Sequence, residues 1–300
     1  MLNIVKGRFV FLAISIAVIL VGIGFMVFNS VNGNGAFNYD VQFVGGTSIE
    51  ADLGTEFDNN DVSAIVVEAT GDSAPQVQKV DDGKTVAIKT VKLDDEQKQA
   101  LKDALVEKYS LTEDQQNSMS IEDVSATLSK EMQKNAVISL LLACAAMLIY
   151  VSFRFREFKT GASCILALVN DTLVVLGSYA IFRVPMDSAF IAAILTVVGY
   201  SINSSVVIFD RIRENKKRLG RKNYAELVNA SVSQTMRRSI FTSLTSFFAI
   251  ACLYVFGGQA VREFAFPISV GIVAGAYSSI FLSANIWYIL CTAFDKKKSK

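Results

Sequence analysis

One acidic residue lies in the middle of a long apolar stretch. Asp171, between Asn170 and Thr172, sits about ten residues, or ~15 Å along a helix, from either end of the run 161–182. An ionised carboxylate at the centre of a membrane helix costs about 2.5–3.5 kcal/mol on insertion scales, so such residues usually mark ion or proton pathways. Asp171 is therefore a candidate proton carrier. A neutral acid that only hydrogen-bonds between helices is the structural alternative.

Neutral polar residues gather in a second apolar run, 188–209. Asn203, Ser204 and Ser205 follow one another there, with Ser201 close before them. Small hydroxyl side chains often hold membrane helices together by packing and hydrogen bonding. Asn203 and Ser204 are candidates for a polar relay, and helix packing remains open for both.

Charged residues stand at the ends of two apolar runs. Arg238 immediately precedes the run 239–256, where an interfacial anchor competes with a side chain that reaches inward. Asp210, Arg211 and Arg213 follow the run 188–209 and are candidates for an interfacial charge cluster.

Two glycine pairs predict close backbone approaches. Gly45 and Gly46 lie inside a short strand-like segment and predict a bulge or a close contact there. Gly271 and Gly275 have the GxxxG spacing that lets membrane helices pack closely.

The sequence lacks the residues that several kinds of catalytic and metal site require. The chain has no histidine, which removes the commonest metal ligand and the usual proton carrier of catalytic triads. Its four cysteines lie in apolar runs without paired spacing, and we expect them to be small buried hydrophobes. We therefore expect no catalytic residue, no metal site and no cofactor.

The elements that must position these residues are long and apolar. Hydrophobic residues make up 52% of the 300, and the mean hydropathy is +0.39. Runs of about 20 such residues, the length that crosses a bilayer, occur at about 9–28, 135–153, 161–182, 188–209, 239–256 and 265–291. The sequence thus predicts an all-α bundle of six membrane helices, the first retained rather than cleaved.

Charge is distributed unevenly along the chain. Residues 29–134 carry 20 Asp and Glu against 9 Lys, a net charge of 9 − 20 = −11, whereas 210–238 contains 9 Lys and Arg. The positive-inside rule then predicts cytoplasmic termini and an acidic domain outside. Phosphates of nucleic acids would be repelled by that domain.

The inserted domain has the pattern of a water-soluble module. Its segments read strand, helix, hairpin, helix, strand, at 41–51, 59–69, 77–80 with 85–90 about a turn at 81–84, 94–108 and 119–124. This β-α-β-β-α-β order predicts a ferredoxin-like α+β domain. We expect three parts: residues 1–28 with the first span, the extracytoplasmic domain 29–134, and residues 135–300 with five spans, the cytoplasmic loop 210–238 and a basic tail.

Several segments together resemble SecF proteins of the SecD/SecF family. They are FVGGTSIE at 43–50, SFRFR at 152–156, the pair Asn170-Asp171, GYSIN at 199–203 with VVIFDRIREN at 206–215, and RSIFTSLTS at 238–246. The resemblance covers nearly the whole chain. It implies a six-span half of the RND superfamily that pairs with SecD, attaches to the SecYEG channel in the bacterial cytoplasmic membrane and helps export preproteins with the proton gradient.

The family pattern also implies roles for single positions. SecF proteins usually have an acid after the Asn of the fourth span, and here that position is Ser204, which cannot titrate. Arg238 matches the family's arginine of the fifth span. Two milder departures are Asn170, where the family often has His, and Gln42, where it usually has an acid.

Three functions therefore compete. The first is an accessory export motor in which Asp171, with acids of SecD, carries protons. The second is a scaffold subunit that has lost coupling, which Ser204 favours. The third is half of a small RND-like transporter, which needs a partner chain or a second copy. Membrane lipid is a partner in every case.

Overall fold

The computed structural model describes residues 3–33, 35–72, 75–80, 83–219 and 223–298. The chain divides by its contacts into two compact units. The first unit consists of residues 1–38, 137–185 and 189–300, and the second of residues 39–136 and 186–188.

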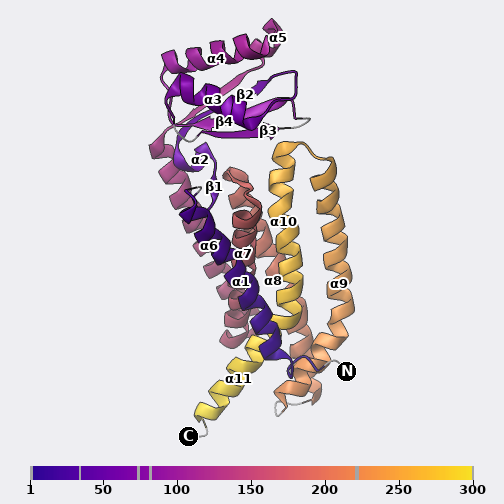
Figure 1. Ribbon diagram of the computed structural model, residues 1–300. Coiled ribbons are helices and arrows are strands. Elements are labelled where there is room, and N and C mark those ends of the chain that lie inside the picture. Colours follow the sequence, from indigo (N-terminus) through magenta and orange to yellow (C-terminus); the bar gives the residue numbers. More distant parts are fainter. Residues whose placement is uncertain (1–2, 34, 73–74, 81–82, 220–222, 299–300) are drawn as a thin grey trace. The chain divides into compact units, whose positions relative to one another are not determined.

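Six helical segments of the described chain are long and apolar enough to cross a membrane, as the sequence predicts (Figure 1). They are α1 (Arg8–Val31), α6 (Ala126–Phe155), α7 (Phe158–Phe182), α8 (Ser188–Leu219), α9 (Tyr224–Phe256) and a composite sixth segment. The sixth joins α10 (Gln259–Tyr277), the π-helical turn η1 (Ser278–Ser283) and α11 (Ala284–Lys298). The stretch 210–238, expected as a loop, is mostly helical because α8 and α9 continue beyond their apolar parts.

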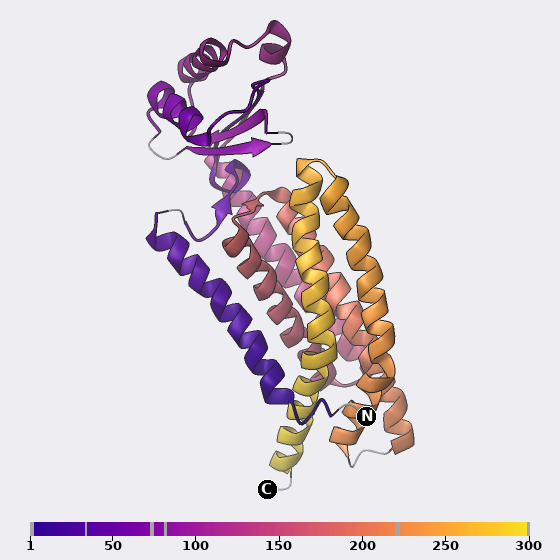
Figure 2. The same cartoon turned by 45° about the vertical axis from the view of Figure 1, so that its right-hand side comes forward.

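Glycines set the closest helix contacts of the first unit. A Cβ atom added at Gly22 of α1 would lie 2.7 Å from the Cα atom of Gly177 in α7. A Cβ atom at Gly271 of α10 would overlap the side chain of Val197 in α8, so the predicted GxxxG contact is present. Helices α9 and α10 run side by side in both views (Figures 1 and 2).

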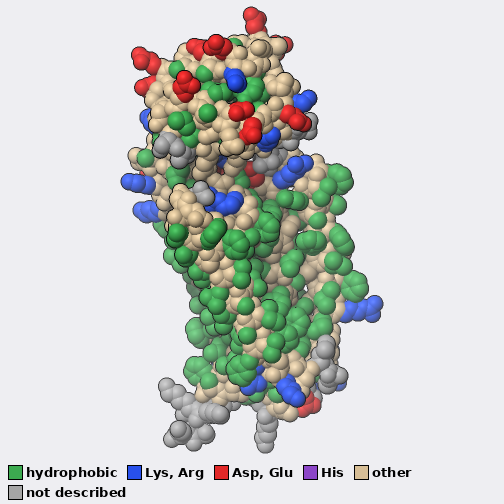
Figure 3. All heavy atoms as spheres, viewed as in Figure 1, with side chains coloured by type: hydrophobic (Ala, Val, Ile, Leu, Met, Phe, Trp, Pro, Cys, Tyr) green, Lys and Arg blue, Asp and Glu red, His purple; other side chains and the backbone are tan. Residues whose placement is uncertain are grey.

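The helices of the first unit differ in how much they bury. In the most apolar stretch of the sixth segment, 61% of the residues are buried inside the protein. The corresponding share is 11% in α1 and in α9, and 6% in α6. Figure 3 shows apolar side chains covering the surface of these helices. The sixth segment is thus central, and α1, α6 and α9 offer apolar surface to lipid or to other membrane helices.

The second unit contains a four-stranded antiparallel sheet in the order β3-β4-β2-β5. The strands are β2 (Gly46–Asp52), β3 (Gln76–Val80), β4 (Thr85–Thr90) and β5 (Ser120–Val124). Helices α3 (Asn59–Thr70) and α4 (Asp95–Tyr109) lie on one face of this sheet (Figure 2). The core between them includes Ile49, Val62, Val86, Ile88, Leu101 and Leu105.

The predicted strand at 41–51 is wrong in its first part. Val41–Val44 form a short helix, α2, because the Asp40 side chain accepts from the backbone N–H of Gln42 and caps its N-terminus. The helix α5 (Glu113–Asn117) was not predicted, although a Thr112–Gln115 capping box begins it. Strands β1 (Asn38–Tyr39) and β6 (Pro185–Met186) form a separate small sheet. Residues 81 and 82 of the predicted turn lie outside the described residues.

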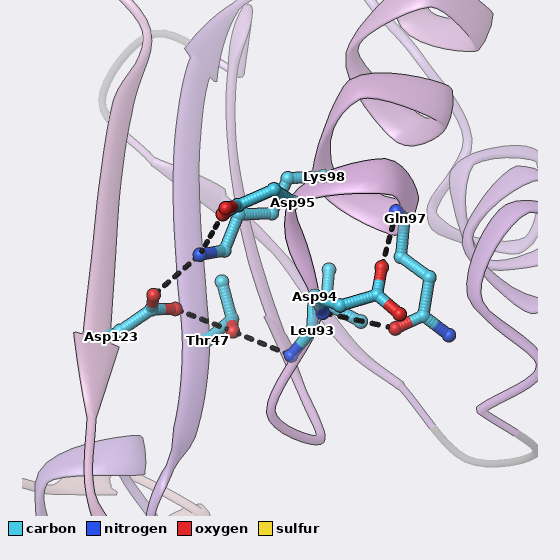
Figure 4. Close-up of polar contacts among 7 residues, drawn as sticks. All are labelled: Thr47, Leu93, Asp94, Asp95, Gln97, Lys98 and Asp123. Atoms are coloured by element: carbon cyan, nitrogen blue, oxygen red, sulfur yellow. Dashed lines mark hydrogen bonds and ion pairs between the residues drawn. The ribbon is translucent and has the colours of Figure 1, made fainter.

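Polar contacts connect the sheet of the second unit to α4 (Figure 4). The Thr47 hydroxyl of β2 donates to Asp123 of β5 at 2.7 Å, and the Lys98 ammonium of α4 lies 2.5 Å from the same carboxylate. Asp94 and Gln97 form a capping box that begins α4.

Candidate functional site

The Asp171 carboxyl group is buried where three segments of the first unit meet. Asp171 lies in α7 and is 0% exposed. Ser201 of α8 and Ser278 of η1 both donate to its Oδ2 atom, each at 2.6 Å. One carboxylate oxygen therefore joins the third, fourth and sixth membrane segments.

Asn170 extends this network toward α1. Its Nδ2 atom donates to Oδ1 of Asp171 at 3.2 Å, and the Ser15 hydroxyl of α1 donates to Oδ1 of Asn170. Ser15 and Asn170 also line an apolar cavity of about 590 Å³ whose walls come from α1, α7, α9 and α10. We call these five residues, Asp171, Asn170, Ser15, Ser201 and Ser278, the Asp171 cluster.

The local structure of the sixth segment positions Ser278. The turn η1 has i→i+5 geometry, which is rare and occurs mostly inside α-helices at functional sites. One turn earlier, a Cβ atom added at Gly275 would lie 3.8 Å from Oδ2 of Asp171 and 3.4 Å from Cβ of Ser201. The small residue lets α10 come close to the carboxylate.

The Asp171 cluster can hold a proton but offers no counter-charge. A carboxyl group binds or releases a proton, and serine hydroxyls can donate or accept. Among the described residues, no basic side chain forms an ion pair or hydrogen bond with Asp171. The same part of the chain contains no group of three or more Cys, Asp or Glu that could hold a metal ion.

The other predicted relay residues lie apart from this cluster. Ser204 donates to the carbonyl oxygen of Tyr200 in its own helix at 3.2 Å. Asn203 of α8 and Arg238 of α9 are exposed. No hydrogen bond or ion pair between described residues connects any of the three to Asp171, and the serine that contacts Asp171 is Ser201.

The predicted charge cluster at the end of the fourth span connects neighbouring helices. Asp210 pairs with Arg154 of α6 at 3.3 Å, with side chains 44% and 43% exposed. Arg211 donates to Gln234 of α9 at 2.6 Å, and Arg213 donates to the backbone carbonyl of Arg154 at 3.4 Å. Ion pairs this exposed contribute about 0–1 kcal/mol, so the cluster orients helix ends more than it stabilises them.

Gly45 and Gly46 are required by the backbone between α2 and β2. Their φ angles are +84° and +143°, a region that favours glycine. A Cβ atom at Gly46 would overlap the carbonyl oxygen of Thr90, and one at Gly45 would lie 3.1 Å from the Cα atom of Ala126. The glycine pair therefore makes the close approach that the sequence predicts.

None of the four cysteines, all of which are among the described residues, forms a disulfide. Cys164 and Cys291 are buried, as expected for small hydrophobes, and Cys144 is partly buried. Cys252 is exposed on α9, so the expectation of burial is wrong there.

Sequence reasoning missed two members of the Asp171 cluster. Ser278 follows Gly275 by three positions within an apolar run, and the pair Ser278-Ser279 is the signal that could have drawn attention to it. Ser15 stands alone in the first span, and only the tertiary contact with Asn170 identifies it.

Comparison with known protein sequences identifies a matching family and several similar proteins. A family model described as protein export membrane protein SecD/SecF, C-terminal, matches residues 105–293. The protein translocase subunit SecF of Sebaldella termitidis is 34% identical over 96% of this chain and 92% of its own length. The protein translocase subunit SecDF of Thermus thermophilus is 36% identical over 82% of this chain and 33% of its own length.

A solved structure is similar to this chain. The crystal structure of SecDF from Thermus thermophilus, described as a translocon-associated membrane protein, is similar with a TM-score of 0.82 and 31% identity. The similarity covers 98% of this chain and 39% of that longer chain.

Proposed function

This chain belongs to the SecD/SecF family of protein export membrane proteins, and from this membership we propose that it assists preprotein export as a SecF-type subunit that uses the proton gradient. Its relatives are named as translocase subunits, a transport role rather than an enzymatic one. With six membrane segments, it is a multi-pass bacterial membrane protein. The translocase that it serves is the SecYEG channel, and its cargo is the translocating preprotein.

SecD is the partner that we propose. The matching protein of Thermus thermophilus is named SecDF, and this chain matches only 33% of its length. A separate SecD subunit would correspond to the remainder of that longer chain. The apolar surfaces of α1, α6 and α9 leave room for such a partner within the membrane.

The proposed orientation puts both termini in the cytoplasm and residues 29–134 outside, as a ferredoxin-like extracytoplasmic domain. Its support is the net charge of 9 − 20 = −11 in that segment against the nine basic residues of 210–238. The antiparallel order β3-β4-β2-β5, with α3 and α4 on one face, fits that fold.

The observation that carries the motor function is the hydroxyl pair on one buried carboxylate oxygen. An ionised Asp171 accepts from both Ser201 and Ser278, whereas a protonated carboxyl group must place its own hydrogen among the same partners. Binding a proton thus changes contacts that join α7, α8 and η1. A ligand shifts a conformational equilibrium only through such differential contacts.

A second candidate function is an uncoupled scaffold that only stabilises the channel. Ser204, which is bonded to its own helix, favours it, as does the lack of any described contact between Arg238 and Asp171. Replacing Ser204 by Asp separates the two candidates. Increased proton flux in this variant would mean that the native site is uncoupled.

The direct test replaces Asp171 by Asn in cells that also contain SecD. Asn keeps the size of the side chain but cannot bind and release a proton, so we expect export to fall to the level measured with an uncoupler. The matched control is Asp123→Asn, the same chemical change in the second unit, which should leave gradient-dependent export unchanged. Unchanged export in Asp171→Asn would contradict the motor function and favour the scaffold.

A further inference from the structure

A second cavity, of about 620 Å³, lies at the end of the helix bundle near the α6–α7 connection. Its walls come from that connection, from the last turns of α8 and from α11. The charged and polar side chains that line it include Arg156, Glu157, Arg213, Lys216, Lys217 and Trp287. Four of these are basic and one is acidic.

Most of this positive charge has no carboxylate partner in the part of the chain that the structure describes. The Lys216 ammonium lies 3.3 Å from Glu157, which uses the acid of the cavity wall. Among the described residues, Arg213 donates only to the backbone carbonyl of Arg154. Arg156 and Lys217 are exposed, and no described carboxylate lies within ion-pair distance of either. Three cations therefore remain to attract an anion.

Trp287 adds an independent sign of a missing ligand. The residue is 1% exposed, and its Nε1 atom has no hydrogen-bond acceptor among the described residues. Buried indole N–H groups usually have a hydrogen-bond acceptor, because a buried donor without a hydrogen bond costs free energy. The Lys216 ammonium lies 5.7 Å from the ring centroid, so cation and indole border the same space.

The position of the cavity along the helices indicates where its ligand comes from. Arg156 and Glu157 form the short connection between two membrane segments, α6 and α7. Tryptophan and basic side chains gather at the depth of lipid headgroups, and basic pockets between membrane helices bind anionic headgroups.

We propose that this cavity binds the phosphate group of an anionic phospholipid. Arg156, Arg213 and Lys217 supply the positive charge, and Trp287 donates its indole N–H to a headgroup oxygen. The ligand would hold the α6–α7 connection against the ends of α8 and α11. This site is separate from the Asp171 cluster and does not depend on the motor function.

The only tryptophan of the chain is Trp287, so its fluorescence reports on this cavity alone. The full chain is held in detergent micelles that contain phosphatidylcholine and is titrated with phosphatidylglycerol. We expect a saturable change in fluorescence with phosphatidylglycerol and none with added phosphatidylcholine. Equal responses to the two lipids would overturn the proposal.

Charge variants test the cations of the cavity wall. Each lost charge should weaken phosphatidylglycerol binding about fivefold, so Lys217→Gln should bind about fivefold more weakly, and Arg156→Gln combined with Lys217→Gln about twenty-fivefold more weakly. The matched control is Arg218→Gln, an exposed neighbour outside the cavity wall, which should bind as the native chain does. An equal loss in this control would mean only a diffuse basic surface and would overturn the site.

Two further measurements address the indole and the source of the phosphate. Trp287→Phe keeps an aromatic ring but loses the N–H donor, and native mass spectrometry should show lower phosphatidylglycerol occupancy. Unchanged occupancy would contradict the role of Trp287. Inorganic phosphate at millimolar concentration should not displace the lipid. Displacement would mean a soluble phosphate ligand and would overturn the lipid assignment.

Discussion

Two carboxylates of this chain accept hydroxyl hydrogen bonds in very different surroundings. Asp123, in the second unit, accepts from Thr47 and pairs with Lys98 at 2.5 Å, with its side chain 37% exposed. Asp171, in the first unit, is fully buried and accepts from two serines and an asparagine. Because a cation and water match the charge of Asp123, its role is structural. The charge of Asp171 has no such match among the described residues, and we propose that its protonation state is what the bundle responds to.

The largest effect should follow from removing both hydroxyls that face Asp171. In Ser201→Ala with Ser278→Ala, the buried Oδ2 atom loses both donors. We expect the bundle to lose about 3–6 kcal/mol of stability, because two hydrogen bonds are removed and hydrogen bonds to charged groups contribute about 1.5–3 kcal/mol each. Thermal unfolding of the purified chain in detergent measures the loss of stability. Gradient-dependent export measures the effect of the same variant on function.

The neighbouring serine offers a matched control. Ser279 is as buried as Ser278, but its hydroxyl donates to the carbonyl oxygen of Ala276 in its own helix. Ser279→Ala should cost about 1 kcal/mol or less, since such bonds are modest. If Ser279→Ala were as damaging as the double variant, helix packing rather than the carboxylate would explain the loss.

A smaller effect is expected from Thr47→Val in the second unit. Thr47 is fully buried, and its hydroxyl both donates to Asp123 and accepts from the backbone N–H of Leu93 at 3.0 Å. The variant leaves that N–H without its acceptor, which costs about 1–3 kcal/mol. Faster hydrogen exchange across 91–124, with export retained, is the expected result. Lost export with unchanged exchange would contradict the structural role.

The smallest effect is expected from Lys98→Met. The Lys98 ammonium, with help from the Thr47 hydroxyl, holds the pKa of Asp123 below its usual value. A carboxyl group with a lowered folded-state pKa stabilises the fold above its unfolded-state pKa of about 3.9, and this contribution is lost as pH falls through the folded-state pKa. We expect acidification from about pH 5 to pH 3 to increase hydrogen exchange of β5 less in Lys98→Met than in the native chain. An identical pH response would contradict the pairing.

The sequence predicts the membrane segments well and the contacts between them poorly. Uninterrupted apolar runs determine the spans, because within lipid a single segment satisfies its own backbone hydrogen bonds only as a helix. Asp171 was found because a single carboxyl group in such a run is costly. Which serine faces it depends on how α8 is rotated against α7, and Gly275 of α10 lies close to both Ser201 and Asp171. The sequence indicates Asn203 and Ser204 as relay candidates and Ser201 only as their neighbour, whereas the contact with Asp171 belongs to Ser201.

Local signals were also overridden in the second unit. The segment 41–44 is more apolar than the strand after it, yet the Asp40 cap makes it a helix and the positive φ of Gly45 ends it. The π turn that carries Ser278 has no sequence signature of its own. In both places, backbone geometry rather than hydrophobic pattern decided the outcome.

The most direct test of the central claim is proton flux into vesicles that contain the purified chain with SecD. The native complex should conduct protons down an imposed gradient, Asp171→Asn should reduce this flux to that of empty vesicles, and Asp123→Asn should leave it unchanged. Equal flux in Asp171→Asn and the native complex would contradict the claim that the buried carboxylate carries the proton.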